Sequence, residues 1–449
     1  MSTSASRTRV YLDHAATTAI RPVALEAFTS GSLTLGNQSS LHQSGRAAKL
    51  RVETARDALA AAVGAHPSEV VFTSGGTESD NLALKGLYWA RRDAARTAGR
   101  DGGARQRHRI VLTGQEHHAI LDTATWLETH EGARLDFVPV HADGMVDLDA
   151  WREALSRDPE TIAVATLMWV NNEIGTVQPI AEAAEIAAEH EVPFHTDAVQ
   201  ALGAVPVDFA ASGATTMAVT GHKIGAPVGV GALLVRRDAT LTPVQHGGGQ
   251  ERDIRSGTIP AALIEAFAAA AAQARDHLDG ERERLGALRD RLIEGVRELI
   301  PEARLTGPED LDPDTGDKLP AGTRRSPGNV HFIFPGCEGD SILFGLDMVG
   351  VEASTGSACS AGVPRPSHVL LALGVDEEAA RSVQRFSLGH TSTAADVEQV
   401  LTALPAVHAS ARRAGMAGHT STIQTANSTA NRTPIRTPNS STPKGDLSV

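Results

Sequence analysis

The chain has 449 residues, of which 41% are hydrophobic and 21% are charged, and its formal net charge is −13. This composition is typical of a globular protein long enough for two domains, and the negative charge argues against direct binding of nucleic acid. We find neither an apolar run of about 18 residues that predicts a membrane span nor the apolar core of a secretory signal. The two cysteines, Cys337 and Cys359, do not make a disulfide framework, so a reducing, cytoplasmic setting is expected.

Hydrophobic periodicity predicts alternating strands and helices through the first half of the chain. After an extended segment at 10–18, apolar spacing predicts helices at 46–63, 81–95, from 119, 149–157 and 179–189, and strands at 70–73, 109–113, 135–140, 161–168 and 193–197. Two further apolar runs flank the turn Thr220–Lys223 and read as strands. This alternation predicts an α/β fold with a mostly parallel sheet covered on both faces. In such sheets, the chemistry gathers at the carboxyl ends of the strands.

The pattern changes after Ile259. A long helical stretch at 261–300 precedes a Pro/Asp/Gly-rich loop at 306–328, and short strands at 330–334, 351–354 and 385–388 predict a smaller α+β domain. The Ser/Thr/Asn/Pro-rich end of the chain is expected to be disordered. We therefore divide the chain into an N-terminal arm that joins the small domain, a large domain, the small domain and a disordered tail, at 1–20, 21–260, 261–408 and 409–449.

One lysine stands apart from the others. Lys223 follows Thr220-Gly-His in a tight turn between two apolar runs and precedes a glycine-rich loop. The other four lysines lie in helical patterns or polar loops, where a solvated role is common: Lys49, Lys85, Lys318 and Lys444. Lys223 is the candidate reactive amine, with a structural or surface lysine as the alternative.

Polar residues follow several of the predicted strands. Ser74–Ser79 closes one strand and opens a helix, which suits either a phosphate or a simple helix cap. His117 follows the strand at 109–113 and could stack on a planar ring, shuttle a proton or be a surface histidine. Asp197, with Gln200 close behind it, is either a turn cap or a buried carboxylate that needs a positive partner such as a protonated heterocycle.

The second half of the chain adds a thiol and a guanidinium. Cys359 lies among small residues in a predicted accessible loop, and Arg385 could clamp a carboxylate or be solvated. Two isolated cysteines and dispersed histidines lack metal-ligand spacing, so no resident metal site is predicted. Together with the groups above, this set matches what a pyridoxal-phosphate enzyme acting on a thiol amino acid requires.

From Tyr11 to about Leu401 the sequence resembles the cysteine desulfurases of the class V pyridoxal-phosphate-dependent aminotransferase family, which have fold type I. The motifs that carry this resemblance are Tyr11-Leu-Asp-His-Ala-Ala-Thr-Thr, Phe72-Thr-Ser-Gly-Gly-Thr-Glu-Ser, Glu116-His-His-Ala, Asn171-Asn-Glu-Ile-Gly-Thr-Val-Gln-Pro-Ile, His195-Thr-Asp-Ala-Val-Gln, Thr220-Gly-His-Lys, Gly247-Gly-Gly-Gln-Glu-Arg-Asp-Ile-Arg-Ser-Gly-Thr, Gly356-Ser-Ala-Cys-Ser and Arg385-Phe-Ser-Leu-Gly. The resemblance implies a large cofactor-binding domain with a seven-stranded type of sheet, and a small domain that carries the Cys359 loop.

The resemblance also implies a role for each matching residue. Lys223 would hold pyridoxal 5′-phosphate covalently. The resemblance implies that the cofactor phosphate is bound by Gly76, Thr77, Thr220 and His222, and by Thr258 from the partner subunit of a homodimer. It also implies that His117 stacks on the cofactor ring and that Asp197 pairs with the pyridine nitrogen. Near the ring hydroxyl it places Gln200 and Asn172.

The remaining assignments concern the substrate. Arg385, beside Asn172, would bind the carboxylate of L-cysteine, Lys223 and His117 would act in catalysis, and Cys359 would be the nucleophile. The implied reaction converts L-cysteine to L-alanine and leaves the sulfur on Cys359 as a persulfide. The length of the segment after Cys359 resembles the long-loop group, which hands sulfur to iron–sulfur scaffolds or transfer-RNA thiolation proteins. The one metal contact it implies is a transient one between Cys359 and an iron–sulfur cluster, and Cys337 matches no motif, so we interpret it as structural.

Three positions depart from the family pattern: His14, Gln38 and His390. None is a core catalytic position, but His390 lies close to Arg385 in the sequence and leaves the preference for substrate or partner open. Another pyridoxal-phosphate enzyme, such as a selenocysteine lyase, is the alternative within the same fold. A catalytically silent scaffold for sulfur-relay partners is the alternative from another class, and the presence of both Lys223 and Cys359 argues against it.

Overall fold

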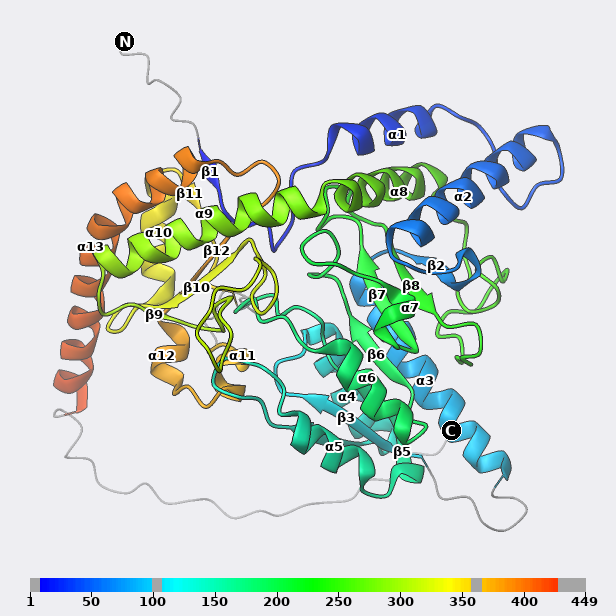
Figure 1. The fold of residues 1–449 in the computed structure, drawn as a ribbon, viewed down its shortest axis with the longest axis horizontal. Helices are drawn as coiled ribbons and strands as arrows, with labels where there is room; N and C mark the ends of the chain where they lie inside the picture. The colour runs from blue at the N-terminus through cyan, green and yellow to red at the C-terminus, as the bar shows by residue number, and fades with distance from the viewer. Residues whose placement is uncertain (1–8, 99–106, 357–365, 427–449) are drawn as a thin grey trace, which may run out of the picture.

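The computed structural model describes residues 9–98, 107–356 and 366–426 (Figure 1). A seven-stranded sheet with the order β2-β8-β7-β6-β5-β3-β4 forms the centre of the larger unit. β8 runs antiparallel to both of its neighbours, and the other paired strands are parallel. The strands are β2 (Val70–Thr73), β3 (Arg109–Thr113), β4 (Arg134–Val138), β5 (Ile162–Thr166), β6 (Phe194–Asp197), β7 (Thr216–Thr220) and β8 (Gly231–Val235). The expectation of a mostly parallel seven-stranded sheet is confirmed.

Helices cover both faces of this sheet because alternate side chains of its strands point to opposite sides. In β3, Ile110 and Leu112 pack in one core cluster with α3 and α4, whereas Val111 packs in the cluster on the other face. The helices on the first face are α3 (Gly76–Ala98) and α4 (His118–Glu131). The other face is covered by α2 (Gln43–Ala62), α5 (Leu148–Ser156), α6 (Ile180–Glu189), α7 (Phe209–Ser212) and α8 (Ala261–Asp276), with α1 (Pro22–Ser32) packed on α8. Two short 3-10 helices, η1 (Pro67–Glu69) and η3 (Pro159–Thr161), lead into β2 and β5.

The smaller unit lies beside the large sheet and is joined to it by α9 (Figure 1). Its strands form an antiparallel sheet of the order β12-β10-β9 and a parallel pair, β1-β11. Because β1 belongs to the N-terminal arm, the arm joins the small unit through that pair, as expected. The elements are β1 (Val10–Tyr11), α9 (Leu278–Leu299), β9 (Arg304–Leu305), β10 (Asn329–Ile333), α10 (Gly339–Met348), β11 (Val351–Glu352), α11 (His368–Ala372), α12 (Glu377–Arg381), β12 (Val383–Ser387) and α13 (Ala394–Ala426).

The structure differs from the sequence-based expectation in three helical regions. The helix expected from Asn81 begins at Gly76, so the glycine-rich turn is partly its first turn. The stretch at 261–300 is two helices, broken at His277. The tail expected to be disordered from residue 409 continues α13 as far as Ala426, and Ala411 still packs in the core of the small unit. Residues 427–449 lie outside the described part of the chain, and the proposed domain boundaries remain a prediction.

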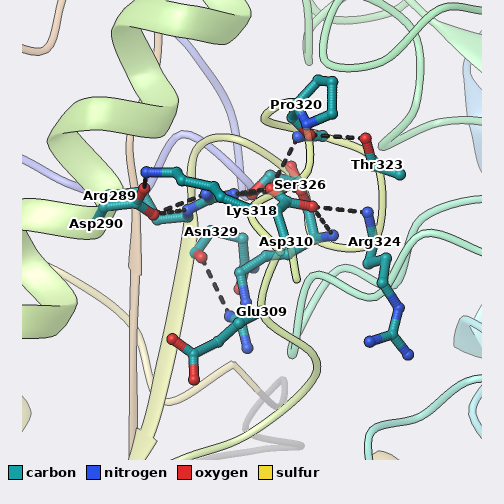
Figure 2. A network of polar contacts seen from close by, with 12 residues as sticks. Arg289, Asp290, Glu309, Asp310, Lys318, Pro320, Thr323, Arg324, Ser326 and Asn329 are labelled. Carbon is teal, nitrogen blue, oxygen red and sulfur yellow. Dashed lines mark hydrogen bonds and ion pairs between the residues drawn. The ribbon is translucent and has the colours of Figure 1, made fainter. Parts of the chain in front are cut away.

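The loop at 306–328, which has no periodicity in the sequence, is organised by one buried carboxylate (Figure 2). Asp310 is 4% exposed, and Oδ2 accepts hydrogen bonds from Arg289 Nη1 at 2.7 Å and the Gly322 amide at 3.0 Å. Oδ1 accepts from the amides of Arg324 at 2.7 Å and Arg325 at 3.0 Å. Backbone groups that a helix or sheet would satisfy are satisfied here by a side chain.

This loop also joins the two units. The Ser326 amide donates to the Gly175 carbonyl at 2.7 Å, and the Val177 amide donates to the Arg324 carbonyl at 2.8 Å. Asn329 Nδ2 donates to the Glu173 carbonyl at 3.0 Å. The loop that follows β5, which carries Asn172, is therefore held by the small unit. None of the helices described is long and apolar enough to cross a membrane.

Replacing Asp310 by alanine should destabilise the protein strongly. The change removes one of the two carboxylates that contact the buried Arg289, leaving only Asp290, and it removes the acceptor of three loop amides, a loss of about 3–5 kcal/mol. Thermal unfolding of the cofactor-loaded protein should show a melting temperature lowered by several degrees. Asp314→Ala, an exposed acid in the same loop, is the matched control and should change the melting temperature little. Equal effects of the two changes would contradict this account.

Candidate active site

A cavity of about 390 Å³ lies at the carboxyl edge of the large sheet. β2, β3, β5, β6 and β7 run in the same direction, so the polar residues after each strand meet there. Residues from the small unit, including Arg385, close the other side. The lining includes nearly all residues that the sequence motifs select: Gly76, Thr77, His117, Asn172, Asp197, Gln200, Thr220, His222, Lys223 and Arg385.

Two predicted site residues are not in this cavity. Thr258 is exposed and does not line it, so its role in a partner's site remains a prediction. Cys359 lies outside the described residues. The segment that carries it begins and ends at the cavity, because Ser354, Gly356 and His368 are lining residues. Cys337 is buried in the core of the small unit, as its structural interpretation requires.

Lys223 presents a largely buried amine to this cavity. Its Nζ donates to the carbonyls of Ala15 and Ala16, in the latter case at 2.8 Å. Burial, together with the nearby Arg385, lowers the pKa of Lys223 to about 8. A substantial fraction of the amine is therefore neutral near neutral pH, as a nucleophilic lysine requires. The remaining lysines have ordinary surface roles where they are described: Lys85 lies over the Trp126 ring, and Lys318 pairs with Asp290.

The start of α3 forms one end of the cavity. Gly75 adopts a φ of +155°, and a side chain at Gly76 would place its Cβ 2.6 Å from Val199, so the backbone approaches closely only because these residues are glycines. Unpaired amides and the helix dipole favour an anion at such a helix start. Thr77 lies on the first turn, and Thr220 is buried beside it. Burial lowers the pKa of His222 to about 4, so it is a neutral donor near neutral pH.

Asp197 is a buried carboxyl on the floor of the cavity. Oδ1 accepts the Val199 amide at 2.8 Å, and burial raises the pKa of this carboxyl, although His117 and Lys223 oppose the rise. Ligand atoms of Asp80, His117 and Asp197 lie within 4.8 Å of one another. Burial, helped by Asp197 and Glu116, raises the pKa of Asp80 well above its usual value. Because two buried carboxyls lie on this floor, it favours a cationic group, such as a protonated pyridine nitrogen.

His117 sits at the junction of β3 and α4. Its Nδ1 accepts the Ala119 amide at 3.1 Å, so in the neutral ring the proton is on Nε2. Burial lowers the pKa of His117, so the ring is largely neutral near neutral pH. A neutral imidazole lining the cavity can stack on a planar ring and exchange a proton with a bound thiol.

Arg385 is held at the opposite wall. Nη1 donates to the Asn172 carbonyl at 2.9 Å, and Nη2 pairs with Asp13 at 2.7 Å. Its buried Nε has no hydrogen-bond partner among the described residues. Because Arg385 lines the cavity, its guanidinium can bind a substrate carboxylate. Gln200 Nε2 donates to the Ala15 carbonyl at 2.9 Å, which fixes the arm over Lys223.

Three lining or neighbouring acids were not selected from the sequence: Asp13, Asp80 and Glu173. Asp80 lies one helical turn after Gly76, so helical spacing from the glycine turn would have placed it on the same face. Glu173 follows Asn172 in the motif that begins at Asn171, which carries part of the family resemblance. The pairing of Asp13 with Arg385 joins two ends of the chain and has no local sequence signal.

The departures His14 and His390 lie behind Lys223, in a separate cavity of about 90 Å³. His14 Nδ1 is 2.6 Å from the Thr18 hydroxyl, which is 3.5 Å from His390 Nδ1. Burial lowers the pKa of His14 to about 4, with a further contribution from His390. Both histidines brace the N-terminal arm rather than line the main cavity.

These residues fit pyridoxal phosphate. The cavity offers an amine with a lowered pKa, a helix start for a phosphate, an acidic floor for a pyridine nitrogen and an imidazole for its ring. With the α/β sheet and the small second unit, this site is that of a pyridoxal-phosphate-dependent enzyme of fold type I.

Comparisons with known proteins agree with this class. The family model "Aminotransferase class-V" matches residues 10–400. The chain is 53% identical over 407 residues to an "IscS-like cysteine desulfurase" of Mycobacterium tuberculosis (strain ATCC 25618 / H37Rv), covering 91% of this chain and 98% of the relative. Among solved structures, a "NifS-like protein" matches with a TM-score of 0.78 and 30% identity, covering 89% of this chain and 99% of that one. "SspA in complex with cysteine" matches with a TM-score of 0.68 and 31% identity, covering 84% and 98%.

The chain therefore belongs to the class-V aminotransferase family, and within it to the cysteine desulfurases. The family, the fold class and the dependence on pyridoxal phosphate, all predicted from the sequence motifs, are confirmed.

The lowered pKa of Lys223 predicts how cofactor attachment depends on pH. Only the neutral amine is nucleophilic, so the rate at which the apoenzyme gains the visible absorbance of lysine-bound cofactor should rise with pH and level off above about 8. An unperturbed lysine would keep rising towards about 10.4. Lys223→Ala should show no such band at any pH. A rate that still rises above pH 9 would contradict the environment described here.

Proposed function

We propose that this enzyme converts L-cysteine to L-alanine and leaves the sulfur as a persulfide on Cys359. The observation that carries the proposal is that one cavity brings together Lys223, His117, Asp197 and Arg385. A buried amine, an imidazole and a clamp for a carboxylate suit an α-amino acid. The names of the relatives given above point to cysteine as that amino acid.

When bound, pyridoxal phosphate supplies an electron sink for the electron pair left on the substrate α-carbon. Lys223 would hold it, with Gly76, Thr77, Thr220 and His222 at its phosphate. Asp197, charged when paired with a cation, keeps the ring nitrogen protonated. Its ring would be contacted by His117, Gln200 and Asn172.

The chain's own side chains then orient the substrate and move its protons. Arg385 holds the carboxylate through its guanidinium, with Asn172 beside it. The amine of Lys223, freed from the cofactor, takes the α-proton, and positioned acid–base groups of this kind contribute about 10²–10⁴-fold. His117, with its proton on Nε2 and a lowered pKa, can exchange a proton with the substrate thiol. The thiolate of Cys359 attacks the substrate sulfur: an S–S bond forms, the C–S bond breaks, and its electron pair stays on carbon, which is protonated to give alanine.

Replacing Cys359 by alanine separates the two halves of this reaction. The variant should still load the cofactor and change its absorbance on mixing with L-cysteine, because those steps use Lys223, His117 and Arg385. Release of alanine and of sulfide in the presence of a reductant should fall to background. Both products can be quantified in the same sample, with Cys337→Ala as the matched control. Wild-type sulfide release by the Cys359 variant would show that another group receives the sulfur.

We also propose that the enzyme acts as a homodimer in which Thr258 completes the phosphate site of the partner subunit. The segment that joins α1 to α2 carries large apolar side chains in solvent: Leu33 is 85% exposed, Leu35 86% and Leu41 89%. Exposed apolar groups of this kind mark an interface. Glu251, from the loop that leads to Thr258, pairs with Arg56 of α2 at 2.7 Å. The loop is therefore anchored on the helix next to this apolar segment.

A Thr258→Ala variant tests that arrangement. It should sediment as a dimer like the wild type but bind pyridoxal phosphate more weakly, by about five- to tenfold, because one hydrogen bond to a charged phosphate is lost. Thr242→Ala, in the chain segment that precedes this loop, is the control. A monomeric wild-type enzyme that binds the cofactor tightly would contradict the proposal.

The acceptor of the persulfide sulfur would be an iron–sulfur scaffold or a transfer-RNA thiolation protein. Support for this class comes from the family resemblance of the segment after Cys359. Mixing the sulfur-loaded enzyme with each purified acceptor, and following the label from ³⁵S-cysteine, distinguishes between them.

A further inference from the structure

Glu173 is a buried acid at the cavity that the reaction described above does not use. It follows β5 directly after Asn172, it is 1% exposed, and it lines the cavity. Its main chain is fixed on both sides. The amide donates to Asn171 Oδ1 at 2.9 Å, and the carbonyl accepts from Asn329 Nδ2 at 3.0 Å. The side chain therefore projects from a rigid loop into a defined place.

The carboxylate of Glu173 binds Ser367, the second described residue after the segment that carries Cys359. The buried Ser367 hydroxyl donates to Oε2 at 2.5 Å. The same hydroxyl accepts the Leu370 amide at 3.1 Å and so caps α11. A hydrogen bond to an ionised acceptor is stronger than one between neutral groups. One end of the Cys359 segment is thus tied to the large unit through Glu173.

The other end of the segment lies against the same side chain. Gly356 has a φ of +86°, and a Cβ there would lie 3.6 Å from Glu173 Cγ and 3.3 Å from His331 Nε2. The Gly356 amide donates to the Ser354 hydroxyl at 3.0 Å, and Ser354 pairs through its main chain with Arg385. Gly356 is therefore fixed between the substrate-binding arginine and Glu173.

We propose that Glu173 is a positioning residue for sulfur transfer, because it bonds to Ser367 and lies beside Gly356, which flank the segment that carries Cys359. The proposal rests on the function assigned to Cys359 above. Fixing both ends of a chain segment reduces the volume its middle explores, and so raises the concentration of a group on it near a fixed target. The effect falls on the step in which Cys359 acts and not on the earlier steps at the cofactor.

Rapid mixing of the cofactor-loaded enzyme with L-cysteine measures the two steps separately. The absorbance change of the cofactor reports substrate binding and α-proton removal, and quenched samples analysed by mass spectrometry report the persulfide on Cys359. In Glu173→Ala the absorbance change should keep its rate and its dependence on L-cysteine concentration. Persulfide formation should slow about tenfold, the effect expected for one lost hydrogen bond to a charged group. Glu173→Gln, which keeps an acceptor oxygen for Ser367, should recover most of the rate.

Ser367→Ala and the double variant Glu173→Ala/Ser367→Ala complete a cycle. Each single change should slow persulfide formation similarly, and the double variant should be no slower than the slower single one. Glu185→Ala, an exposed acid on α6, is the control and should leave both steps unchanged. Equal slowing of both steps in Glu173→Gln, or multiplied effects in the double variant, would overturn the proposal. Persulfide formation on a residue other than Cys359 would instead refute the proposed function.

Discussion

The rest of the site depends on the acidic floor of the cavity, which Asp197 and Asp80 form at the carboxyl edge of the large sheet. Asp197 and Asp80 are almost completely buried, and neither makes an ion pair with a described arginine or lysine. A buried carboxylate is costly unless a positive group is near it. Lys223 and the nitrogen of the bound cofactor are the groups able to supply that charge. The floor therefore favours a cationic heterocycle, whereas burial and the nearby Arg385 lower the pKa of Lys223 against the opposing effect of Asp197.

A second constraint is that the cavity has walls from two units and from the N-terminal arm. The carbonyls of Ala15 and Ala16, which receive the Lys223 amine, belong to the arm, and the arm is paired with β11 of the small unit. Asp13 of the arm also pairs with Arg385. The lysine and the substrate clamp therefore depend on the same short segment. The loop organised by Asp310 braces the opposite wall, so both walls are built partly from the small unit.

This architecture separates the two chemical tasks. The residues proposed to contact the cofactor lie at the strand ends, where Asp197 and His117 accept hydrogen bonds from backbone amides. In the proposed reaction, sulfur transfer would use Cys359, which lies between Gly356 and Ser367 in the sequence. Glu173 of the large unit lies beside Gly356 and bonds to Ser367, so it connects this segment to the loop that follows β5. The proposed persulfide would thus form on a part of the chain distinct from the strand ends.

The sequence alone determined the alternation of strands and helices, the reactive lysine and most lining residues, because hydrophobic periodicity and strand-end motifs are local signals. It misplaced the start of α3 and the end of α13, where a glycine turn and a polar composition hide helical backbone. Only the tertiary structure decided the pairing of Asp13 with Arg385, the four hydrogen bonds to Asp310, and the contact between Glu173 and Ser367. Each of these joins residues far apart in the chain or in an aperiodic loop. Their energies come from burial and charge pairing, which exist only once the chain has folded.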